Sequence, residues 1–451
     1  MNLLESAFTN IWNKGVAARS PRLSGGLDLG SIVRDGQISN QQYYLPTQKR
    51  AEHIYIRGRT GSGKTRLLLR MCLADIIAGR GFLIGDTQGQ IIPLLCGAIA
   101  ALAGSITDKV ILISPSDPLR SIGLNILSQG RNVFIEIAAI TETLMHKLGL
   151  SHLGVTVQEL LRNCLFCLAS CGLTIVDLPP FLWSPAFRAR CLKSVENVEV
   201  REFFLQRFEP LSDAMKNLRR EALLNKFSEL VADWHFRDIL GQIRSTINFD
   251  DILATGKIVL LDVPKALLGP HAATFCSLII QQFAPAIFSR KCRKLFSFYL
   301  DEVPDWLGPG IDIDVLLSQA RKYMICLCLA HQFEAQLDVT LRGAVAATGT
   351  QIFFQQSAPD AVSAAQALAL GKSSVEALVN LKARHCFIKS GHYPAREVRV
   401  PNVDLPFADP RELITRSLER YTRPRAEIEA EILSRRQSAN PTDTEALNDW
   451  E

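Results

Sequence analysis

The chain has 451 residues, of which 47% are hydrophobic and 21% are charged, and its net charge is +5. This composition excludes a disordered or fibrous chain, is typical of a soluble globular protein of two or three units, and permits contact with nucleic acid without arguing for it. The eleven cysteines lie scattered in apolar segments, which indicates reduced thiols in the cytosol rather than a disulfide framework.

The first part of the chain is polar and rich in turn-forming residues, so we expect an N-terminal segment (1–50) that is too short to be a domain. Its start lacks the charged beginning and the continuous apolar run of a signal peptide. The longest apolar stretch, Ile91 to Gly104, is shorter than the roughly 20 residues that span a bilayer. We therefore expect no integral membrane segment and a cytoplasmic protein, either free or attached to the inner membrane through a partner.

A phosphate-binding pattern follows this segment. The apolar run from His53 to Ile56 predicts a buried strand, and a leucine-rich stretch at helical spacing begins after Thr65. Between them, Gly58 to Thr65 fits the pattern G-x-x-x-x-G-K-[ST], whose glycines let backbone N–H groups converge on phosphate oxygens beside a helix N-terminus. The strand–loop–helix context favours this interpretation over a glycine-rich surface turn.

The pattern predicts a site for a nucleoside triphosphate. Lys64 would reach the β- and γ-phosphates, and the Thr65 hydroxyl would hold Mg²⁺. The predicted nucleotide-binding residues are Gly58, Thr60, Gly61, Ser62, Gly63, Lys64 and Thr65.

Further along, short apolar runs alternate with helical patterns. Gly81–Asp86 and Lys109–Ser114 predict buried strands, each preceded by a candidate helix, which is typical of βαβ units around a parallel sheet. From about Phe134 to Gly241 the pattern is helical and amphipathic, and it predicts an all-α insertion. Strand signals then resume over 257–264, 295–302, 324–330, 350–357 and 385–391.

These patterns predict an α/β fold with a mainly parallel central sheet. The sheet domain would comprise 51–134 and 242–401, interrupted by an all-α insertion domain over 135–241. Beyond this domain the chain is proline-rich and charged, so we expect a charged C-terminal tail (402–451).

A pair of adjacent carboxylates, Asp301 and Glu302, completes the predicted site. They follow an apolar run and would lie at the carboxyl end of a buried strand, where open α/β sheets bind ligands. Asp301 would hold Mg²⁺, directly or through water, and Glu302 would orient and deprotonate the attacking water. Adjacent carboxylates favour hydrolysis over transfer to a small acceptor, for which no pocket is evident, so an ATPase is favoured over a nucleoside kinase.

Two further residues are candidates for the hydrolytic step. The segment Ser318–Leu337 predicts a helix that carries Arg321, followed by an apolar strand that ends at His331 and Gln332. An arginine at the sheet edge could reach the nucleotide of a neighbouring subunit, and an amide at a strand end beside the γ-phosphate could sense hydrolysis. Taken alone, an arginine on a helix is more often a solvated charge.

Two other features have simpler explanations. Cys164, Cys167 and Cys171 share one apolar helix face, which favours a buried thiol stripe over a zinc site because no fourth ligand is nearby. The insertion interleaves basic with acidic residues, as a solvated helix face does, and the lining of a DNA entrance is the alternative. Its basic residues include Arg188, Arg190, Lys193, Lys216, Arg219, Arg220 and Lys226.

The order of these motifs resembles the HerA/FtsK superfamily of ring-forming, DNA-pumping ATPases, and within it the coupling proteins of type IV secretion and conjugation. The resemblance spans roughly residues 50–400 and implies a RecA-like P-loop NTPase domain, an all-α insertion and a homohexamer. It implies that Lys64 and Thr65 are nucleotide and Mg²⁺ ligands, Asp301 the second Mg²⁺ contact, Glu302 the catalytic base, Arg321 a trans-acting finger and Gln332 a sensor.

The chain departs from this family at two places. In the stretch GDTQGQIIPLL, only Asp86 and Gly89 match the relatives' Asp-Pro-His-Gly-Asp, which leaves no predicted role beyond Asp86. Membrane-bound coupling proteins begin with transmembrane helices, which we do not find in this sequence, and the segment 1–50 leaves no room for the small β-barrel of HerA-type translocases. We therefore expect a soluble relative without the membrane anchor.

The sequence thus predicts an ATP-hydrolysing DNA translocase or coupling protein. It would use ATP and Mg²⁺ to bind and move DNA, largely independently of DNA sequence, as a hexameric ring in conjugation or mobile-element transfer. A relaxase, a nuclease or a transfer-channel protein would be its partner. The alternative is a nucleotide-gated scaffold ATPase that recruits a protein partner without pumping DNA, because both activities would use the same site.

Overall fold

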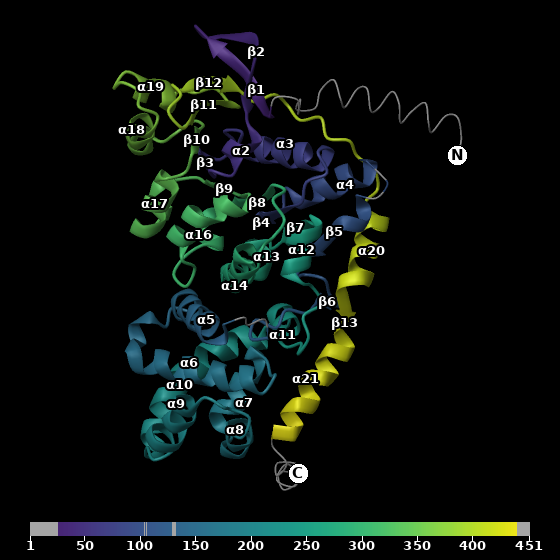
Figure 1. The fold of residues 1–451 in the computed structure, drawn as a ribbon, viewed down its shortest axis with the longest axis vertical. Coiled ribbons are helices and arrows are strands. Elements are labelled where there is room, and N and C mark those ends of the chain that lie inside the picture. The colour runs from purple at the N-terminus through teal and green to yellow at the C-terminus, as the bar shows by residue number, and fades with distance from the viewer. Residues whose placement is uncertain (1–25, 103, 105, 129–131, 440–451) are drawn as a thin grey trace, which may run out of the picture.

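Figure 1 shows the computed structural model of the chain, which describes residues 26–102, 104, 106–128 and 132–439. Within these residues, an 11-stranded sheet with its covering helices forms the upper part of the view, and a bundle of helices forms the lower part. The strand order across the sheet is β2 (Gln37–Leu45), β1 (Leu27–Arg34), β12 (Arg396–Arg399), β11 (His385–Ser390), β10 (Thr350–Phe353), β3 (Ile54–Arg57), β9 (Ile325–His331), β8 (Phe296–Asp301), β4 (Phe82–Asp86), β7 (Ile258–Asp262) and β5 (Val110–Ile113).

The strands from β10 to β5 run parallel, whereas β1, β2, β11 and β12 pair antiparallel at one end of the sheet. Each strand predicted from an apolar run is present, so the predicted α/β fold with a mainly parallel sheet is confirmed. Strands β1, β2 and β12 lie outside the predicted set. The edge strand β2 shows the reason, because most of its side chains are polar and face solvent, and such a strand has no apolar run.

The parallel strands are buried on both faces of the sheet, and successive side chains along a strand pack alternately into two hydrophobic cores. Leu83 belongs to a core that includes α14 (His271–Phe288) and the helices of the insertion. Its neighbours Phe82 and Ile84 belong to a second core, formed with α3 (Lys64–Ile77) and α4 (Ile92–Leu102). Strands covered on both faces are apolar at every position, which is why the sequence marked them clearly.

Shorter helices complete the sheet domain. They are α2 (Thr47–Arg50), α12 (Phe249–Thr255), α13 (Lys265–Leu268), α15 (Val303–Trp306), α16 (Ile313–Ala320), α17 (Val339–Ala346), α18 (Ala358–Ala367) and α19 (Ser374–Val379). Several begin at a side-chain cap, such as Asn248 for α12 and Asp312 for α16, whose oxygens accept backbone N–H groups of the first turn.

Between β6 (Arg120–Ile122) and β7, the described elements are all helical. The insertion comprises α5 (Val133–Lys147), α6 (Gly154–Ser170), α7 (Leu178–Trp183), α8 (Pro185–Leu192), α9 (Val198–Glu202) with a π-helical continuation (Phe203–Phe208), α10 (Asp213–Ala232) and α11 (Trp234–Leu240), with short 3₁₀ turns. Because the helices of this insertion share one hydrophobic core with a face of the sheet, the two parts pack as one body.

The two segments that connect the insertion to the sheet domain lie side by side. Gly123 and Thr246 are joined twice, because each backbone N–H donates to an oxygen of the other residue at 2.9 Å. Asn125 adds two bonds, one from its backbone N–H to Ser245 Oγ (3.0 Å) and one from its side chain to the Ile243 carbonyl (3.0 Å).

The end of the chain differs from the expected charged tail. Residues 411–439 instead form α20 (Arg411–Tyr421), β13 (Thr422–Pro424) and α21 (Arg425–Ala439), while 440–451 lie outside the described residues. These elements run down one side of the molecule, from the sheet edge to the insertion (Figure 1). The Ser417 hydroxyl of α20 accepts the Leu112 N–H of the edge strand β5 at 2.8 Å, and β13 pairs with β6.

The expected N-terminal segment is likewise part of the fold where it is described. Residues 1–25 lie outside the described residues, and 26–50 contribute β1, β2 and α2 to the sheet domain. Helix α14 is long and apolar enough to cross a membrane, but most of its residues are buried in the core. Of the predicted buried thiol stripe, Cys164 and Cys167 are buried on α6, and burial raises the pKa of both thiols. Cys171 follows the end of this helix and is only partly buried.

Candidate active site

The loop between β3 and α3 is shaped by its glycines. Gly61 (φ 75°) and Gly63 (φ 123°) adopt backbone conformations that favour glycine. A Cβ atom on Gly63 would lie 3.0 Å from Arg384 Cα, and one on Gly58 would lie 2.6 Å from Phe354 Cβ. A larger residue at either position would therefore displace the chain beside it.

Lys64 lies at the start of α3 with its side chain folded onto this loop. Its Nζ donates to the Gly58 carbonyl at 2.6 Å and to the Arg59 carbonyl at 3.4 Å. Burial lowers the pKa of Lys64, while the charges of Asp301 and Glu302 act in the opposite direction. The ammonium group is thus held by neutral carbonyls, and a phosphate anion would be a much stronger partner.

The same loop presents hydrogen-bond donors that its own fold does not use. Within the described parts of the chain, no backbone carbonyl accepts the N–H groups of Gly61, Gly63, Lys64 or Thr65. The Ser62 Oγ is buried and also lacks a partner among these residues. Unused donors at a helix N-terminus would suit the oxygens of a phosphate chain.

Asp301 and Glu302 lie at the carboxyl end of β8, as predicted. The Asp301 side chain is 6% exposed, and its backbone carbonyl accepts the Trp306 Nε1–H at 2.6 Å. Burial raises the pKa of Asp301 to about 6, the charge of Glu302 adds to the effect, and Lys64 opposes it. Glu302 has a left-handed backbone (φ 57°), which costs a non-glycine residue about 1 kcal/mol. Such strain is typical of functional positions.

The residues present fit Mg²⁺ only in company with a nucleotide. No cluster of three or more His, Cys, Asp or Glu side chains that could hold a metal occurs in the part of the chain that the structure describes. Mg²⁺ usually keeps several waters and binds one or two carboxylates together with the phosphates of its substrate. The Thr65 hydroxyl and the Asp301 carboxylate are a partial set of this kind.

A line of amide hydrogen bonds joins the phosphate loop to Glu302. Thr60 Oγ1 donates to Gln332 Oε1 at 2.8 Å, and Gln332 Nε2 donates to Glu302 Oε1 at 2.6 Å. From the other side, Gln88 Nε2 donates to the same Glu302 oxygen at 3.2 Å. The order follows the strands β3, β9, β8 and β4 across the sheet. The second oxygen, Glu302 Oε2, accepts no hydrogen bond from the described residues.

Gln88 is a site residue for which the sequence predicted no role. Its turn is fixed by Asp86, whose carboxylate accepts the backbone N–H groups of Gln88 and Gly89 (3.0 and 2.9 Å) and of Ile91 and Ile92 (2.6 and 3.2 Å). The predicted residue Asp86 thus has a structural task, which is to aim Gln88 at Glu302. The sequence contained Asp86 and Gly89 as signals of the turn, but not the direction of the side chain between them.

Arg321 lies apart from the other predicted residues. It precedes β9 on the amino edge of the sheet, whereas the phosphate loop, Glu302 and Gln332 lie on the carboxyl edge. Its side chain is 61% exposed, and Nη2 lies 3.0 Å from Glu52 Oε1. The structure does not bring Arg321 to the phosphate loop of its own chain.

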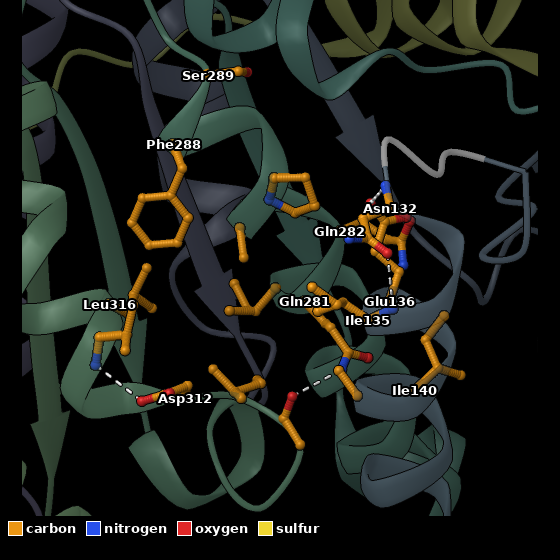
Figure 2. A pocket seen from close by; sticks show the side chains of 17 residues that line it. Asn132, Ile135, Glu136, Ile140, Gln281, Gln282, Phe288, Ser289, Asp312 and Leu316 are labelled. Carbon is orange, nitrogen blue, oxygen red and sulfur yellow. Dashed lines mark hydrogen bonds between the residues drawn. The ribbon is translucent and has the colours of Figure 1, made fainter. Parts of the chain in front are cut away.

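A separate cavity of about 490 Å³ lies between α5, α14 and α16 (Figure 2). Apolar side chains such as Ile140, Phe288 and Leu316 face it, and its charged lining residues, Glu136 and Asp312, are acidic. Because phosphates require cationic partners, this cavity does not suit a nucleotide, and the phosphate loop remains the candidate site.

Solved structures with the same fold include a bacterial conjugative coupling protein and a VirB4 protein. The plasmid coupling protein TrwB in complex with the non-hydrolysable ATP analogue ADPNP has a TM-score of 0.62 at 15% identity, covering 84% of this chain and 95% of that chain. TrwB in complex with ADP and Mg²⁺ has a TM-score of 0.59 at 16% identity, covering 84% and 95%. VirB4 of Thermoanaerobacter pseudethanolicus has a TM-score of 0.58 at 16% identity, covering 85% and 98%.

No family model and no curated protein matches the chain. The likeness to TrwB and VirB4 extends over most of the chain at low identity, and it confirms the predicted RecA-like P-loop NTPase fold with its helical part. The resemblance inferred from the sequence is therefore confirmed at the level of the fold.

Proposed function

We propose that this protein is a Mg²⁺-dependent ATPase that binds and moves DNA as a homohexameric ring. The observation that carries the proposal is the hydrogen-bonded line from Thr60 through Gln332 to Glu302, beside a phosphate loop with unused donors. A pure nucleotide-binding module would need the loop alone. A carboxylate oriented toward the same edge of the sheet supports hydrolysis.

The residues divide the work as follows. The loop N–H groups and Lys64 bind and orient the phosphate chain, with its terminal phosphate near Glu302. Glu302 Oε1 is fixed by the amides of Gln88 and Gln332, which leaves Oε2 to take the proton from the attacking water. Gln332 contacts both the loop and the base, so it is placed to sense whether the terminal phosphate is present.

Mg²⁺, held by Thr65 and Asp301, would neutralise charge on the phosphate oxygens. Because the pKa of Asp301 is raised to about 6, this carboxylate is ionised above pH 6 and protonated below it. Metal-dependent activity should therefore fall as the pH drops through 6.

The DNA and the ring are supported by the coupling-protein fold and by the position of Arg321. An exposed arginine on the edge of the sheet opposite the phosphate loop is suited to reach the nucleotide of a neighbouring subunit in a head-to-tail ring. We further propose a cytoplasmic location and a client such as a relaxase, a nuclease or a transfer-channel protein.

The test is ATP hydrolysis with and without DNA over a salt series, with the Glu302→Gln variant beside the wild type. Replacing the base by its isostere should lower the hydrolysis rate about 10³-fold while ATP binding persists. DNA should accelerate the wild-type protein, and the acceleration should fade as salt rises.

The matched control is Glu221→Gln on the exposed side of α10, which should leave hydrolysis unchanged. Full activity in Glu302→Gln would contradict the proposed base. Glu302-dependent hydrolysis that is indifferent to DNA would instead support the nucleotide-gated scaffold that recruits a protein partner.

A further inference from the structure

The amino edge of the sheet, opposite the phosphate loop, carries a row of basic residues. Five neighbouring parallel strands are each preceded, within three residues, by a lysine or an arginine. In spatial order they are Lys322 before β9, Lys294 before β8, Arg80 before β4, Lys257 before β7 and Lys109 before β5. Because adjacent strands lie about 4.8 Å apart, this amino-edge row extends over roughly 20 Å.

Most charges of the amino-edge row are not neutralised by the protein. No acidic side chain of the described residues forms an ion pair with Lys109, Lys257, Lys294 or Lys322. Arg80 lies 3.4 Å from Asp75, but that carboxylate is already paired with the buried Arg50 at 2.7 Å. Unpaired cations aligned on one edge create a positive potential that attracts a polyanion.

A cavity of about 450 Å³ opens within this row. Five cationic side chains and no acidic one line it. The cationic lining residues are Arg80, Lys109, Arg290, Arg293 and Lys294. The cavity is therefore selective for anions by its charge.

Arg290, one of these lining residues, strengthens the preference of the cavity for anions. Its side chain is buried, and its guanidinium donates to the backbone carbonyls of Leu253 (3.1 and 3.3 Å), Tyr323 (2.9 Å) and Met324 (3.5 Å), while no carboxylate of the described residues pairs with it. A buried cation without a carboxylate partner is costly. An anion bound in the cavity would offset that cost, so the buried guanidinium favours anion binding there.

We propose that the amino-edge row binds the phosphodiester backbone of nucleic acid. A single phosphate would need one cluster of cations, whereas cations repeated along roughly 20 Å suit a chain of phosphates. Backbone contacts of this kind do not read sequence. The inference rests on the proposed function and deepens it, because it assigns the DNA contact to the sheet edge rather than to the insertion.

The experiment measures the binding of a fluorescently labelled single-stranded oligonucleotide to the full chain by anisotropy over a salt series. The test variant combines Lys109→Gln, Lys257→Gln and Lys294→Gln, three lysines without ion-pair partners. Losing three phosphate contacts should lower the slope of log affinity against log salt by about 2 and weaken binding about 100-fold at 0.1 M salt. The matched control combines Lys193→Gln, Arg201→Gln and Lys226→Gln on the insertion, where the first two side chains are exposed and Lys226 is partly exposed, and it should bind as the wild type does.

Each outcome separates this inference from the proposed function. If the slope of log affinity against log salt falls in the insertion variant and not in the edge variant, the assignment of the contact to the amino-edge row is wrong, while DNA binding by the protein stands. If the wild type does not bind the oligonucleotide, the proposed function itself fails. If the wild type instead binds phosphatidylserine vesicles through the same three lysines, the row is a lipid site and the inference is overturned. Equal thermal melting and equal ATP binding of both variants establish that they are folded.

Discussion

The two edges of the central sheet carry opposite charge at the ends of the same strands. At the carboxyl edge, β4, β7 and β8 end in Asp86, Asp262 and Asp301. At the amino edge, the same three strands are preceded by Arg80, Lys257 and Lys294.

The burial of these groups differs as much as their charge. Asp301 is buried, and desolvation raises its pKa; Asp262 is partly buried, and desolvation together with the nearby Asp86 raises its pKa. Lys294 and Lys322, in contrast, are exposed to solvent. The buried carboxylates of the carboxyl edge suit direct contact with a metal ion and the phosphates that it binds. The exposed lysines of the amino edge suit the long-range attraction of a polyanion.

The largest expected effect tests whether Arg321 alone, at the β9 end of the amino edge, reaches the phosphate loop of a neighbouring subunit. Arg321→Ala should lower ATP hydrolysis about 10³-fold, the usual contribution of a finger that stabilises transferred phosphate charge. Folding should be nearly unaffected, because the pair with Glu52 is half-exposed and contributes about 1 kcal/mol or less. Steady-state ATPase assays and thermal melting measure the two quantities.

A mixing experiment supplies the control for that prediction. Lys64→Ala subunits lack a working phosphate loop but keep Arg321. Combined with Arg321→Ala subunits, they should recover part of the lost activity if the arginine acts on the neighbouring nucleotide. Two inactive preparations that stay inactive when mixed would mean that Arg321 does not act on the neighbouring nucleotide.

The next prediction concerns the buried charge of the carboxyl edge. The folded-state pKa of Asp301, about 6, exceeds the value of about 3.9 for an unfolded chain. Folding therefore loses stability as the pH rises from about 4 to 6, and the loss is complete above 6. Asp301→Asn should raise the unfolding free energy on the order of 2–3 kcal/mol at pH 8 and by little at pH 4.5.

Urea unfolding without Mg²⁺ or nucleotide measures this difference at the two pH values. The exposed Asp314→Asn serves as the control, since its carboxylate is hydrated in both states. A gain of the same size at both pH values would refute the assignment of the effect to the charge of Asp301.

The smallest expected effect concerns the hydrogen bonds that hold Glu302 at the carboxyl edge. Gln88→Leu removes one of the two amides that hold Glu302 Oε1, so hydrolysis should fall about 10-fold, the equivalent of one hydrogen bond. ATP affinity should not change, because Gln88 does not belong to the phosphate loop. Gln90→Leu, two residues away and exposed, should behave as the wild type in the same kcat and KM measurements.

The sequence revealed the parts of this site that depend on local chain geometry. The phosphate loop needs glycines where Gly61 and Gly63 have positive φ, and Lys64 and Thr65 at the helix start, so a short pattern defines it. Asp301 and Glu302 were predictable because a strand buried on both faces is apolar until it ends.

Other features depend on which strands are neighbours, and periodicity carries no information about strand order. Gln88 reaches Glu302 because β4 lies beside β8, and Gln332 stands between Thr60 and Glu302 because β9 lies between β3 and β8. The amino-edge row is hidden for the same reason, since its lysines are scattered from Lys109 to Lys322. The polar edge strand β2 and the two C-terminal helices lack the apolar runs on which strand and core predictions depend.

The C-terminal elements have a mechanical consequence. Two connecting segments bound side by side, as at Gly123 and Thr246, define an axis about which the helical part could swing. A third attachment to the helical part restrains this motion. Helix α21 provides it, because Arg435 bonds the Gly241 carbonyl (2.6 Å) and Asp177 (3.3 Å), and Arg425 bonds Asp238 (2.6 Å). Any swing of the insertion must therefore first break these contacts of α21. The C-terminal helix thus restrains the motion of the insertion relative to the sheet.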